Sequence, residues 1–432
     1  MSDLGDRLSN LTAEQRRLLE KRLSEMGLAA AEGRRAGPAK SPAASTPIAD
    51  PDAWLKHAPA RRVRFSLYFF SDDGSKESGA KYRLVLESAR FADEHGFDAV
   101  WTPERHFQPF GGLYPNPSVL GAALAAVTSR VGIRAGSVAL PLHNPVRVAE
   151  EWSVVDNLSE GRVAVSFASG WHPDDFVLYP TPYEERKEAM FRGIETIRSL
   201  WAGRQIRLEG PGGREVVVRI LPRPVQPELP VWVTTAGSPA TWERAGAIGA
   251  NVLAALVGYS PEELTSLVGR YRAARAAAGH DPLAGNVTMV AHTYVGADDD
   301  EVREMVREPM TGYLKAYLAQ FQNLSLGATS DADRDAREVA ALAFEHYFDS
   351  ATLLGTQGKC AHVVDALAAC GADEVACLVD FGLAADTVLA ALPRLADLRR
   401  HYAVETGSER TLNETAAPEA ALGAAAGGEG KG

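Results

Sequence analysis

Eight short apolar runs recur along the middle of the sequence, each separated from the next by a stretch with helical character. They cover residues 63–70, 99–101, 131–140, 162–168, 231–235, 251–255, 287–295 and 374–379. The runs are almost continuously apolar, whereas strands of an antiparallel sheet usually alternate apolar and polar residues. They therefore predict buried parallel strands, and eight of them alternating with helices predict an α/β fold of the (β/α)8 TIM barrel type.

An open, doubly wound sheet is the alternative fold for this alternation. That fold normally carries a glycine-rich dinucleotide-binding turn after its first strand, but residues 71–79 read SDDGSKESG and lack the G-x-G-x-x-G spacing. Two segments exceed a minimal barrel. Residues 206–220 predict a β-hairpin through Gly210-Pro211-Gly212-Gly213, and residues 302–354 predict a helical insertion that serves either as a lid or as an additional packing layer.

Both ends of the chain differ in composition from this body. Thr12 and Gln15 form a capping box ahead of the apolar stripe Leu19, Leu23 and Met26, so residues 12–26 predict one amphipathic helix. Residues 29–51 and those after 405 are rich in small residues and proline, which cannot bury enough apolar surface to become ordered. We predict a helix and flexible linker over 1–60, a barrel domain over 61–404 and a disordered tail over 405–432.

Charge and cysteine content exclude several classes of protein. There are 45 Lys and Arg against 56 Asp and Glu, a net charge of -11, which argues against nucleic acid or an anionic membrane as the main partner. The sequence carries neither a secretory signal nor an apolar stretch long enough to span a membrane. Its three cysteines, Cys360, Cys370 and Cys377, lack C-x-x-C spacing, so we predict a cytoplasmic protein without disulfides or structural zinc.

Polar and small residues follow several of the predicted strands, at the end where barrel enzymes build their active sites. The second strand leads into Glu104, Arg105 and His106, which place an acid, a permanent cation and an imidazole together. An ordinary ion pair beside a satisfied loop histidine is the structural alternative. After the fourth strand, Ser169-Gly170-Trp171-His172 offers a glycine for close backbone approach and a flat indole surface.

The loop after the fifth strand has the composition of an anion site. Residues 234–241 read TTAGSPAT, and Pro239 suits the first turn of a helix. Free backbone N–H groups and the helix dipole would attract a phosphate there, and Ser238 and Thr241 could donate hydroxyl hydrogen bonds. A plain N-capped helix explains the same residues. The anion-site interpretation is supported only because the other polar loops are predicted at the same end of the barrel.

Metal binding is the competing use of the loop histidines. His106, His143 and His172 fall on three adjacent loops, and imidazole is the commonest metal ligand. No H-E-x-x-H helix or other carboxylate and histidine spacing supports such a site. We therefore predict polar pocket residues and no catalytic metal.

Several motifs in one order resemble those of the bacterial luciferase-like, FMN-dependent monooxygenases. They are FSLYFFSDD, FDAVWTPERHF, the long segment from NPSVLGAALAAV to SFASGWHPDDF, PVWVTTAG, and GTQGKCAHVVDALAACGADEVACLVDFG. The PERHF element and the ending ACLVDFG look most like the subgroup associated with nonribosomal peptide and polyketide biosynthesis. The family folds as a (β/α)8 barrel, in agreement with the strand pattern.

The resemblance implies roles for individual residues. Glu104 would lie beside the flavin, and the Gly136-Ser137 bond would take the place of a non-prolyl cis peptide under the isoalloxazine. The remaining residues implied to contact FMN are Ser169, Gly170 and Trp171 after the fourth strand and Ala236, Gly237, Ser238 and Thr241 in the phosphate region. Luciferases proper carry a histidine, an arginine and a glutamate in place of Arg105, Ser169 and Ala236, so light emission is not expected.

The activity implied by the resemblance is monooxygenation with reduced FMN supplied by a separate flavin reductase. A C4a-(hydro)peroxide would form and insert one oxygen atom into a natural-product intermediate, either a small molecule or one bound to a carrier protein. Arg105 would offset the negative charge of the flavin, His106 would exchange protons, and Trp171 and Phe107 would form apolar walls.

The resemblance also suggests a homodimer, and the N-terminal helix is a candidate recognition arm for a carrier protein. Two alternatives stay open. A deazaflavin (F420)-dependent oxidoreductase would use the same barrel for hydride transfer, and a catalytically silent protein would bind flavin without turnover.

Overall fold

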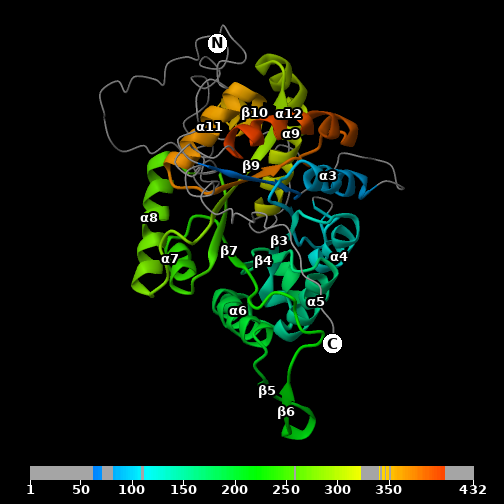
Figure 1. Cartoon of the computed structure of the whole chain (residues 1–432), viewed down its shortest axis with the longest axis vertical. Helices are drawn as coiled ribbons and strands as arrows, with labels where there is room; N and C mark the ends of the chain where they lie inside the picture. Colours follow the sequence, from blue (N-terminus) through cyan, green and yellow to red (C-terminus); the bar gives the residue numbers. More distant parts are fainter. Residues whose placement is uncertain are drawn as a thin grey trace, which may run out of the picture.

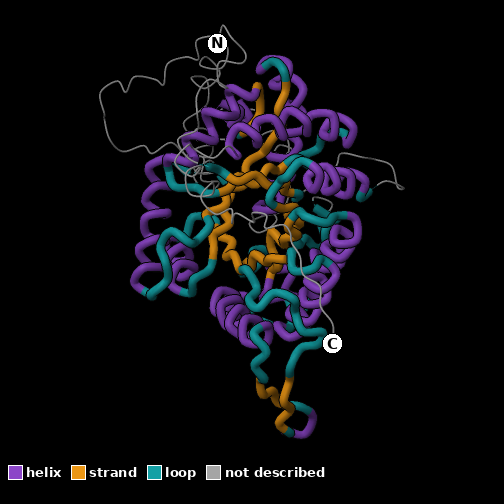
Figure 2. The backbone as a smooth tube through the Cα atoms, in the orientation of Figure 1, coloured by secondary structure: helices purple, strands orange, loops and turns teal. Residues whose placement is uncertain are grey.

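Eight parallel strands close into a barrel, and they coincide with the eight predicted runs. In order around the barrel they are β1 (Arg64–Tyr68), β2 (Ala99–Thr102), β3 (Gly132–Ala139), β4 (Val163–Ala168), β7 (Val231–Thr235), β8 (Asn251–Ala255), β9 (Val287–Gly296) and β11 (Glu374–Leu378), which pairs again with β1. Figure 2 shows the strands surrounded by helices. The (β/α)8 prediction is confirmed.

The computed structural model describes residues 62–70, 81–108, 111–256, 259–322, 340, 343–345, 347–349 and 352–403. The predicted helix over 12–26, the linker and the C-terminal tail lie outside these ranges. Within the described ranges, we find no helix whose length and apolar character would let it cross a membrane.

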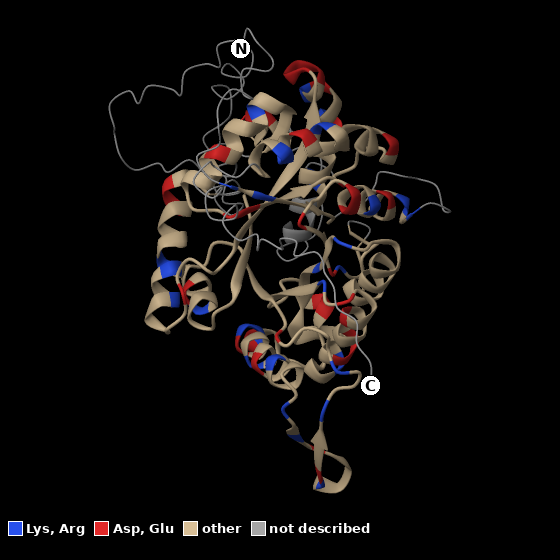
Figure 3. Cartoon of the chain, in the orientation of Figure 1, with Lys and Arg blue, Asp and Glu red and all other residues tan. Residues whose placement is uncertain are grey.

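The helices begin where the sequence supplies capping side chains. The Asn116 side chain accepts hydrogen bonds from the first turn of its helix, Asn144 does the same, and Ser260 forms a capping box with Glu263. A proline follows each of these three caps. The helices are α3 (Arg83–Glu94), α4 (Pro117–Val127), α5 (Pro145–Leu158), α6 (Arg186–Trp201), α7 (Pro239–Ala247), α8 (Pro261–Ala277), α9 (Asp299–Gln322), α11 (Gln357–Ala369) and α12 (Ala385–Ala403). Basic and acidic side chains are interspersed along them (Figure 3).

The predicted hairpin is present as antiparallel strands β5 (Ile206–Glu209) and β6 (Glu215–Val218). It projects away from the barrel beyond α6 (Figure 1). Because most side chains of these strands are exposed, the hairpin adds little to the core.

The second insertion is helical at its start but not at its end, which corrects the prediction. Helix α9 begins at Asp299, and its buried Val302, Val306 and Met310 make it a packing layer beside β9. Residues 353–356 form strand β10 (Leu353–Thr356), parallel to the end of β9. A four-residue strand is too short to stand out from a helical stretch by periodicity alone. Residues 323–339, which belong to the predicted lid or packing layer over 302–354, lie outside the described residues.

A buried carboxylate occupies the floor of the barrel. Glu374 opens β11 and is fully buried. Its Oε1 accepts hydrogen bonds from Ser66 Oγ at 2.6 Å and Arg134 Nη1 at 2.9 Å, and its Oε2 accepts one from Asn286 Nδ2 at 2.8 Å. Burial opposes ionisation, but the charges of Arg134 and Arg64 and these hydrogen bonds outweigh it and lower the pKa of Glu374 to about 2.

Candidate active site

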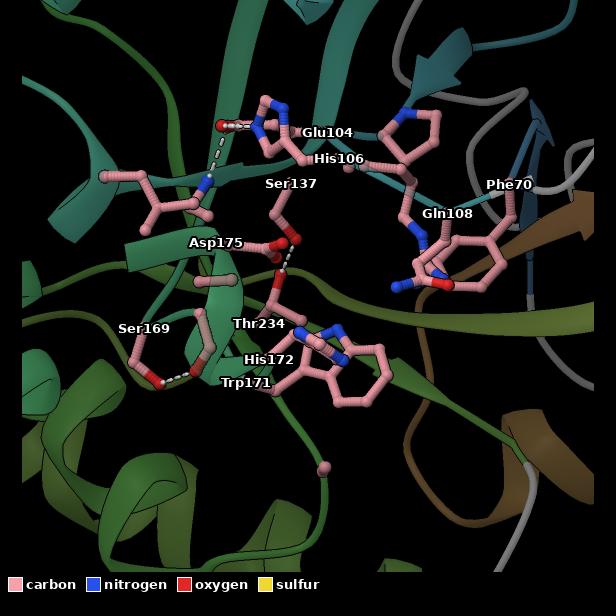
Figure 4. A pocket seen from close by; sticks show the side chains of 18 of the residues that line it. Phe70, Glu104, His106, Gln108, Ser137, Ser169, Trp171, His172, Asp175 and Thr234 are labelled. Atoms are coloured by element: carbon pink, nitrogen blue, oxygen red, sulfur yellow. Dashed lines mark hydrogen bonds and ion pairs between the residues drawn. The ribbon is translucent and has the colours of Figure 1, made fainter. Parts of the chain in front are cut away.

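A cavity of about 350 Å³ opens at the carboxyl ends of the strands (Figure 4). The residues predicted for the site that line it are Glu104, Arg105, His106, Gly136, Ser137, Ser169, Gly170, Trp171 and Ala236. They come from the loops or ends of β2, β3, β4 and β7, so the topology gathers segments that are far apart in the sequence. The cavity is large enough for a small molecule.

Glu104 is the centre of a hydrogen-bonded cluster at the rim of the cavity. Its Oε1 lies 2.8 Å from His106 Nε2 and 2.6 Å from His143 Nε2. Its Oε2 accepts a hydrogen bond of 2.8 Å from the backbone N–H of Ala139. The side chain is only 1% exposed, and His106 enters the cavity beside it (Figure 4). Glu104 thus pairs with two imidazoles, whereas the structural alternative was an ordinary ion pair with Arg105.

This cluster shifts the protonation of its members in a consistent direction. Burial opposes the charge on Glu104, but the hydrogen bonds from His106 and His143 outweigh it, so the pKa of Glu104 lies below its usual range. Burial also opposes charge on His143, yet the hydrogen bond and the charge of Glu104 raise the pKa of His143 above its usual range. The arrangement favours a carboxylate next to a protonated imidazole.

Arg105 lies buried between aromatic rings. Its guanidinium carbon is 4.6 Å from the ring centroid of Phe70 and 5.6 Å from that of Trp171. Both rings line the cavity, so the arginine contributes a permanent positive charge stabilised by π faces. Phe107, in contrast, is 61% exposed and does not line the cavity, so the apolar wall predicted for it is wrong. Phe70 and Leu142 supply apolar lining instead.

Small hydroxyl side chains surround the Gly136-Ser137 peptide, which is cis as the resemblance implies. Ser137 Oγ lies 2.5 Å from Thr234 Oγ1, which in turn lies 2.7 Å from Ser166 Oγ. A Cβ atom on Gly136 would come within 2.8 Å of the Tyr68 ring, so the close approach requires glycine. Gly136 and Ser137 therefore line the cavity with tightly packed backbone.

The loop after β4 brings a further acid into the cavity. Asp175 lines it together with His172, as Figure 4 shows. Burial raises the pKa of Asp175 above its usual range, although the charges of His106, His172 and Arg105 oppose that rise. The His172 ring is nearly buried, and neither of its nitrogens has a hydrogen-bond partner among the described residues. Asp175 can therefore meet polar atoms of a ligand, whereas the ring nitrogens of His172 are buried.

The predicted phosphate region sits at the start of α7, next to the cavity. Gly237 has φ of +96°, which favours glycine, and Ser238 is the N-cap of the helix but makes no side-chain capping bond. Its hydroxyl is thus available to an anion at the helix N-terminus. Gly237, Ser238 and Thr241 do not line the cavity itself, whereas Ala236 does.

Three residues of the site escaped sequence reasoning in part or altogether. Tyr68 lines the cavity and donates its hydroxyl to the carbonyl of Gly136, but in the sequence it is one aromatic residue of a strand. Asp175 stands in the quoted GWHPDDF segment and was not singled out. The sequence marks His143 as a polar residue after the third strand and as a possible metal ligand, but its contact with Glu104 joins residues from two separate loops. A polar residue directly after a predicted strand was the one signal available for His143.

No three or more His, Cys, Asp or Glu side chains within the described ranges are arranged to bind a metal ion. His106 and His143 converge instead on the Glu104 carboxylate.

Comparison with known proteins agrees with this geometry. A family model described as luciferase-like monooxygenase matches residues 63–374. The oxygenase component of a flavin-dependent trigonelline monooxygenase from Acinetobacter baylyi is 27% identical over 342 residues, covering 77% of this chain and 93% of that protein. The separate name of an oxygenase component implies a reductase partner for that protein.

Solved structures share the fold. The monooxygenase RslO1 from Streptomyces bottropensis superposes with a TM-score of 0.64 at 27% identity, covering 79% of this chain and 100% of that one. The oxygenating constituent of 3,6-diketocamphane monooxygenase from Pseudomonas putida, in complex with FMN, gives a TM-score of 0.62 at 17% identity, covering 78% and 97%. Enzymes that depend on F420 share the fold as well.

The family model covers the barrel from β1 to the start of β11, including every loop that lines the cavity. The chain therefore belongs to the luciferase-like monooxygenase family and is an enzyme of the flavin-dependent monooxygenase type.

Proposed function

We propose that the chain uses reduced FMN, delivered by a separate reductase, to insert one oxygen atom of O2 into an organic substrate. The observation that carries this proposal is the cavity itself, lined by the Gly136-Ser137 peptide and the buried cation of Arg105, with the uncapped helix N-terminus at Ser238 beside it. When bound, reduced FMN would supply the oxygen chemistry through its C4a-(hydro)peroxide. The protein's part is to bind the flavin, exclude water and hold protons.

Titration with flavins tests this proposal. The fluorescence of FMN should be quenched when the protein binds it, and oxygen should oxidise the bound reduced flavin. F420-dependent hydride transfer is the second candidate, favoured by the F420 enzymes among the structural neighbours. Tighter binding of F420 than of FMN would select it. Binding of FMN without any reaction of its reduced form with oxygen would identify a catalytically silent flavin protein.

The flavin phosphate is expected at the N-terminus of α7. Ser238→Glu should weaken FMN binding by at least about tenfold, because the new carboxylate repels the phosphate at the positive end of the helix dipole. Fluorescence titration measures the effect. Ser238→Ala is the matched control, since it removes one hydroxyl without adding charge and should have a smaller effect. An unchanged FMN affinity in Ser238→Glu would place the phosphate elsewhere.

Arg105 is expected to matter for turnover more than for folding. Arg105→Ala should slow the oxygen-dependent reaction of the reduced flavin by about 10²-fold, because it removes the fixed positive charge in a water-poor site. Arg105→Lys keeps the charge but loses the planar stacking on Phe70 and Trp171, so an intermediate rate is expected. A parallel loss of thermal stability and activity in Arg105→Ala would instead assign the residue a structural role.

A natural-product intermediate is the proposed substrate, free or bound to a carrier protein. The motifs quoted above support this class, and Asp175 offers it a polar contact inside the cavity. Mass spectrometry of candidate intermediates should detect the gain of one oxygen atom. Faster turnover of a free acid than of the same acid on its carrier protein would argue against carrier-bound delivery.

A homodimer is proposed from an apolar surface on α5 and the segment that follows β6. Val154 and Leu158 on α5, and Leu221 and Val225 in the segment after β6, are exposed. The backbone N–H of Val225 donates to Asp156 Oδ2 at 2.7 Å, so this segment packs against α5. Leu158→Asp should convert the dimer to a monomer in sedimentation velocity. A wild-type protein that sediments as a monomer would contradict the proposal.

A further inference from the structure

One buried carboxylate connects an imidazole that lines the cavity with a second imidazole that is more exposed to solvent. His106 lines the cavity and its side chain is 11% exposed. Glu104 is buried between the two rings, and the His143 side chain is 29% exposed and lies outside the cavity lining. Exposure therefore rises from the carboxylate to His143, which sits directly before the N-cap of α5.

We propose that His106, Glu104 and His143 form a proton relay between the cavity and solvent. The inference deepens the proposed function, on which it rests, because a flavin reaction at the cavity must exchange protons with water. The relay assigns His143 a role in the reaction although it does not touch the cavity. His143 would act through Glu104, as a positioning and proton-transferring residue.

The geometry suits transfer through a single oxygen. Oε2 of Glu104 is held by the Ala139 N–H, which leaves Oε1 to both imidazoles at 2.8 and 2.6 Å. For proton delivery, the Nε2–H bond of protonated His143 breaks as an O–H bond forms at Oε1. That O–H bond then breaks as an N–H bond forms at Nε2 of neutral His106 in the tautomer that carries its proton on Nδ1, and the Nδ1–H bond breaks as that proton passes to a group in the cavity. One proton and one positive charge move inward, no electrons are exchanged, and His143 regains its proton from water.

Other charged groups face the relay. On the solvent side, Glu151 of α5 raises the pKa of His143, and Arg147 and Ser118 hold Glu151 in turn. On the cavity side, Asp175 and Arg105 lie near His106. The negative charges of Glu104 and Glu151 thus favour the protonated form of His143. At the cavity end, one acid, Asp175, and one cation, Arg105, have opposing effects on the charge of His106. A proton entering from solvent therefore meets a favourable first site.

Histidine NMR on the full chain without flavin tests whether the hydrogen-bonded chain exists. The pKa of His143 should lie above the ordinary histidine range in the wild type and return toward it in Glu104→Gln, because the neighbouring charge is lost. His280→Gln, at an exposed site, should leave the titration of His143 unchanged. An ordinary pKa for His143 in the wild type, or no change in Glu104→Gln, would overturn the relay.

Kinetics then separates proton transfer from positioning. His143→Gln can keep a hydrogen bond to Glu104 but cannot take up a proton, so in dilute buffer it should slow the oxygen-dependent reaction of bound reduced FMN by about 10²-fold. His143→Ala should be equally slow and should recover when imidazole is added. His280→Gln should behave as the wild type. A wild-type rate in His143→Gln, or a slow His143→Ala that imidazole does not rescue, would overturn the relay.

Together, the NMR titration and the kinetic measurements distinguish failure of the relay from failure of the proposed function. A wild-type chain that binds no FMN, or whose reduced FMN is inert to oxygen, would overturn the proposed function and with it the kinetic role of the relay. The NMR arm needs no flavin and would still decide whether the chain of hydrogen bonds is formed. Normal flavin chemistry with His143→Gln as fast as the wild type would overturn the relay alone.

Discussion

Replacing Glu374 by alanine is expected to lower the free energy of unfolding by about 3–5 kcal/mol, because breaking one half of a buried ion pair leaves the other charge uncompensated. Arg134 would remain at the barrel floor with its guanidinium 5.0 Å from the Trp101 ring and 4.8 Å from the Trp232 ring. Asn286 and Ser66 would also lose their acceptor. Denaturant unfolding at neutral pH measures the difference.

The pH dependence of this difference identifies its cause. The folded pKa of Glu374 is about 2, below its usual value, so the stability it contributes is present above the unfolded pKa and is lost as pH falls through the folded one. The gap between wild type and Glu374→Ala should therefore narrow as pH is lowered from about 5 to about 2. Glu195→Ala on the exposed face of α6 is the control. A gap below about 1 kcal/mol, or one that is constant with pH, would contradict the account.

The fold was largely predictable because its strands are buried on both sides. Burial makes each barrel strand almost continuously apolar, and eight such runs leave few other architectures. Strand β10 was missed because its sequence, Leu-Leu-Gly-Thr, is short and adjoins a long helical stretch. What selects it as a strand is the open edge of β9 at residues 293–296, a tertiary feature that local sequence does not carry.

The site was predictable only to the level of its loops. In a barrel, residues after each strand must meet at one end, so Glu104, Arg105 and Ser169 could be placed near one another. The hydrogen-bond partner of each side chain could not be predicted. The contact between Glu104 and His143 spans 39 positions and depends on the angle between two loops. Phe107 was misplaced because its φ of +58° is set by the folded loop and its ring ends exposed.

The two buried glutamates of the barrel differ in the partners that neutralise them. At the floor, Glu374 is paired with an arginine, which does not release its proton near neutral pH, and with neutral donors. At the mouth, Glu104 is paired with two imidazoles, which do. The first arrangement fixes charge for stability, and the second lets a proton move. We therefore expect loss of the floor carboxylate to affect mainly unfolding and loss of the mouth carboxylate to affect mainly turnover.

Glu104→Gln is accordingly expected to slow the oxygen-dependent reaction of bound reduced FMN by about 10²–10³-fold, since it removes a charge that holds two imidazoles in the site. Glutamine keeps the size of the side chain but has one acceptor oxygen for three donors, the Ala139 N–H and the two rings. One buried donor is left without a partner, which should cost only about 1–3 kcal/mol of stability. Stopped-flow absorbance of the flavin measures the rate, and denaturant unfolding measures the stability.

The matched control is Glu150→Gln, a neighbouring acid on α5 that pairs with Arg147 at the surface and should change neither quantity. Fluorescence titration must also find Glu104→Gln still able to bind FMN, because a lost cofactor would mimic a lost proton pathway. With FMN bound and the fold intact, a wild-type rate in Glu104→Gln would contradict a catalytic role for this carboxylate. A rate that falls only in proportion to the fraction of folded protein would reduce Glu104 to a structural anchor of the two loops.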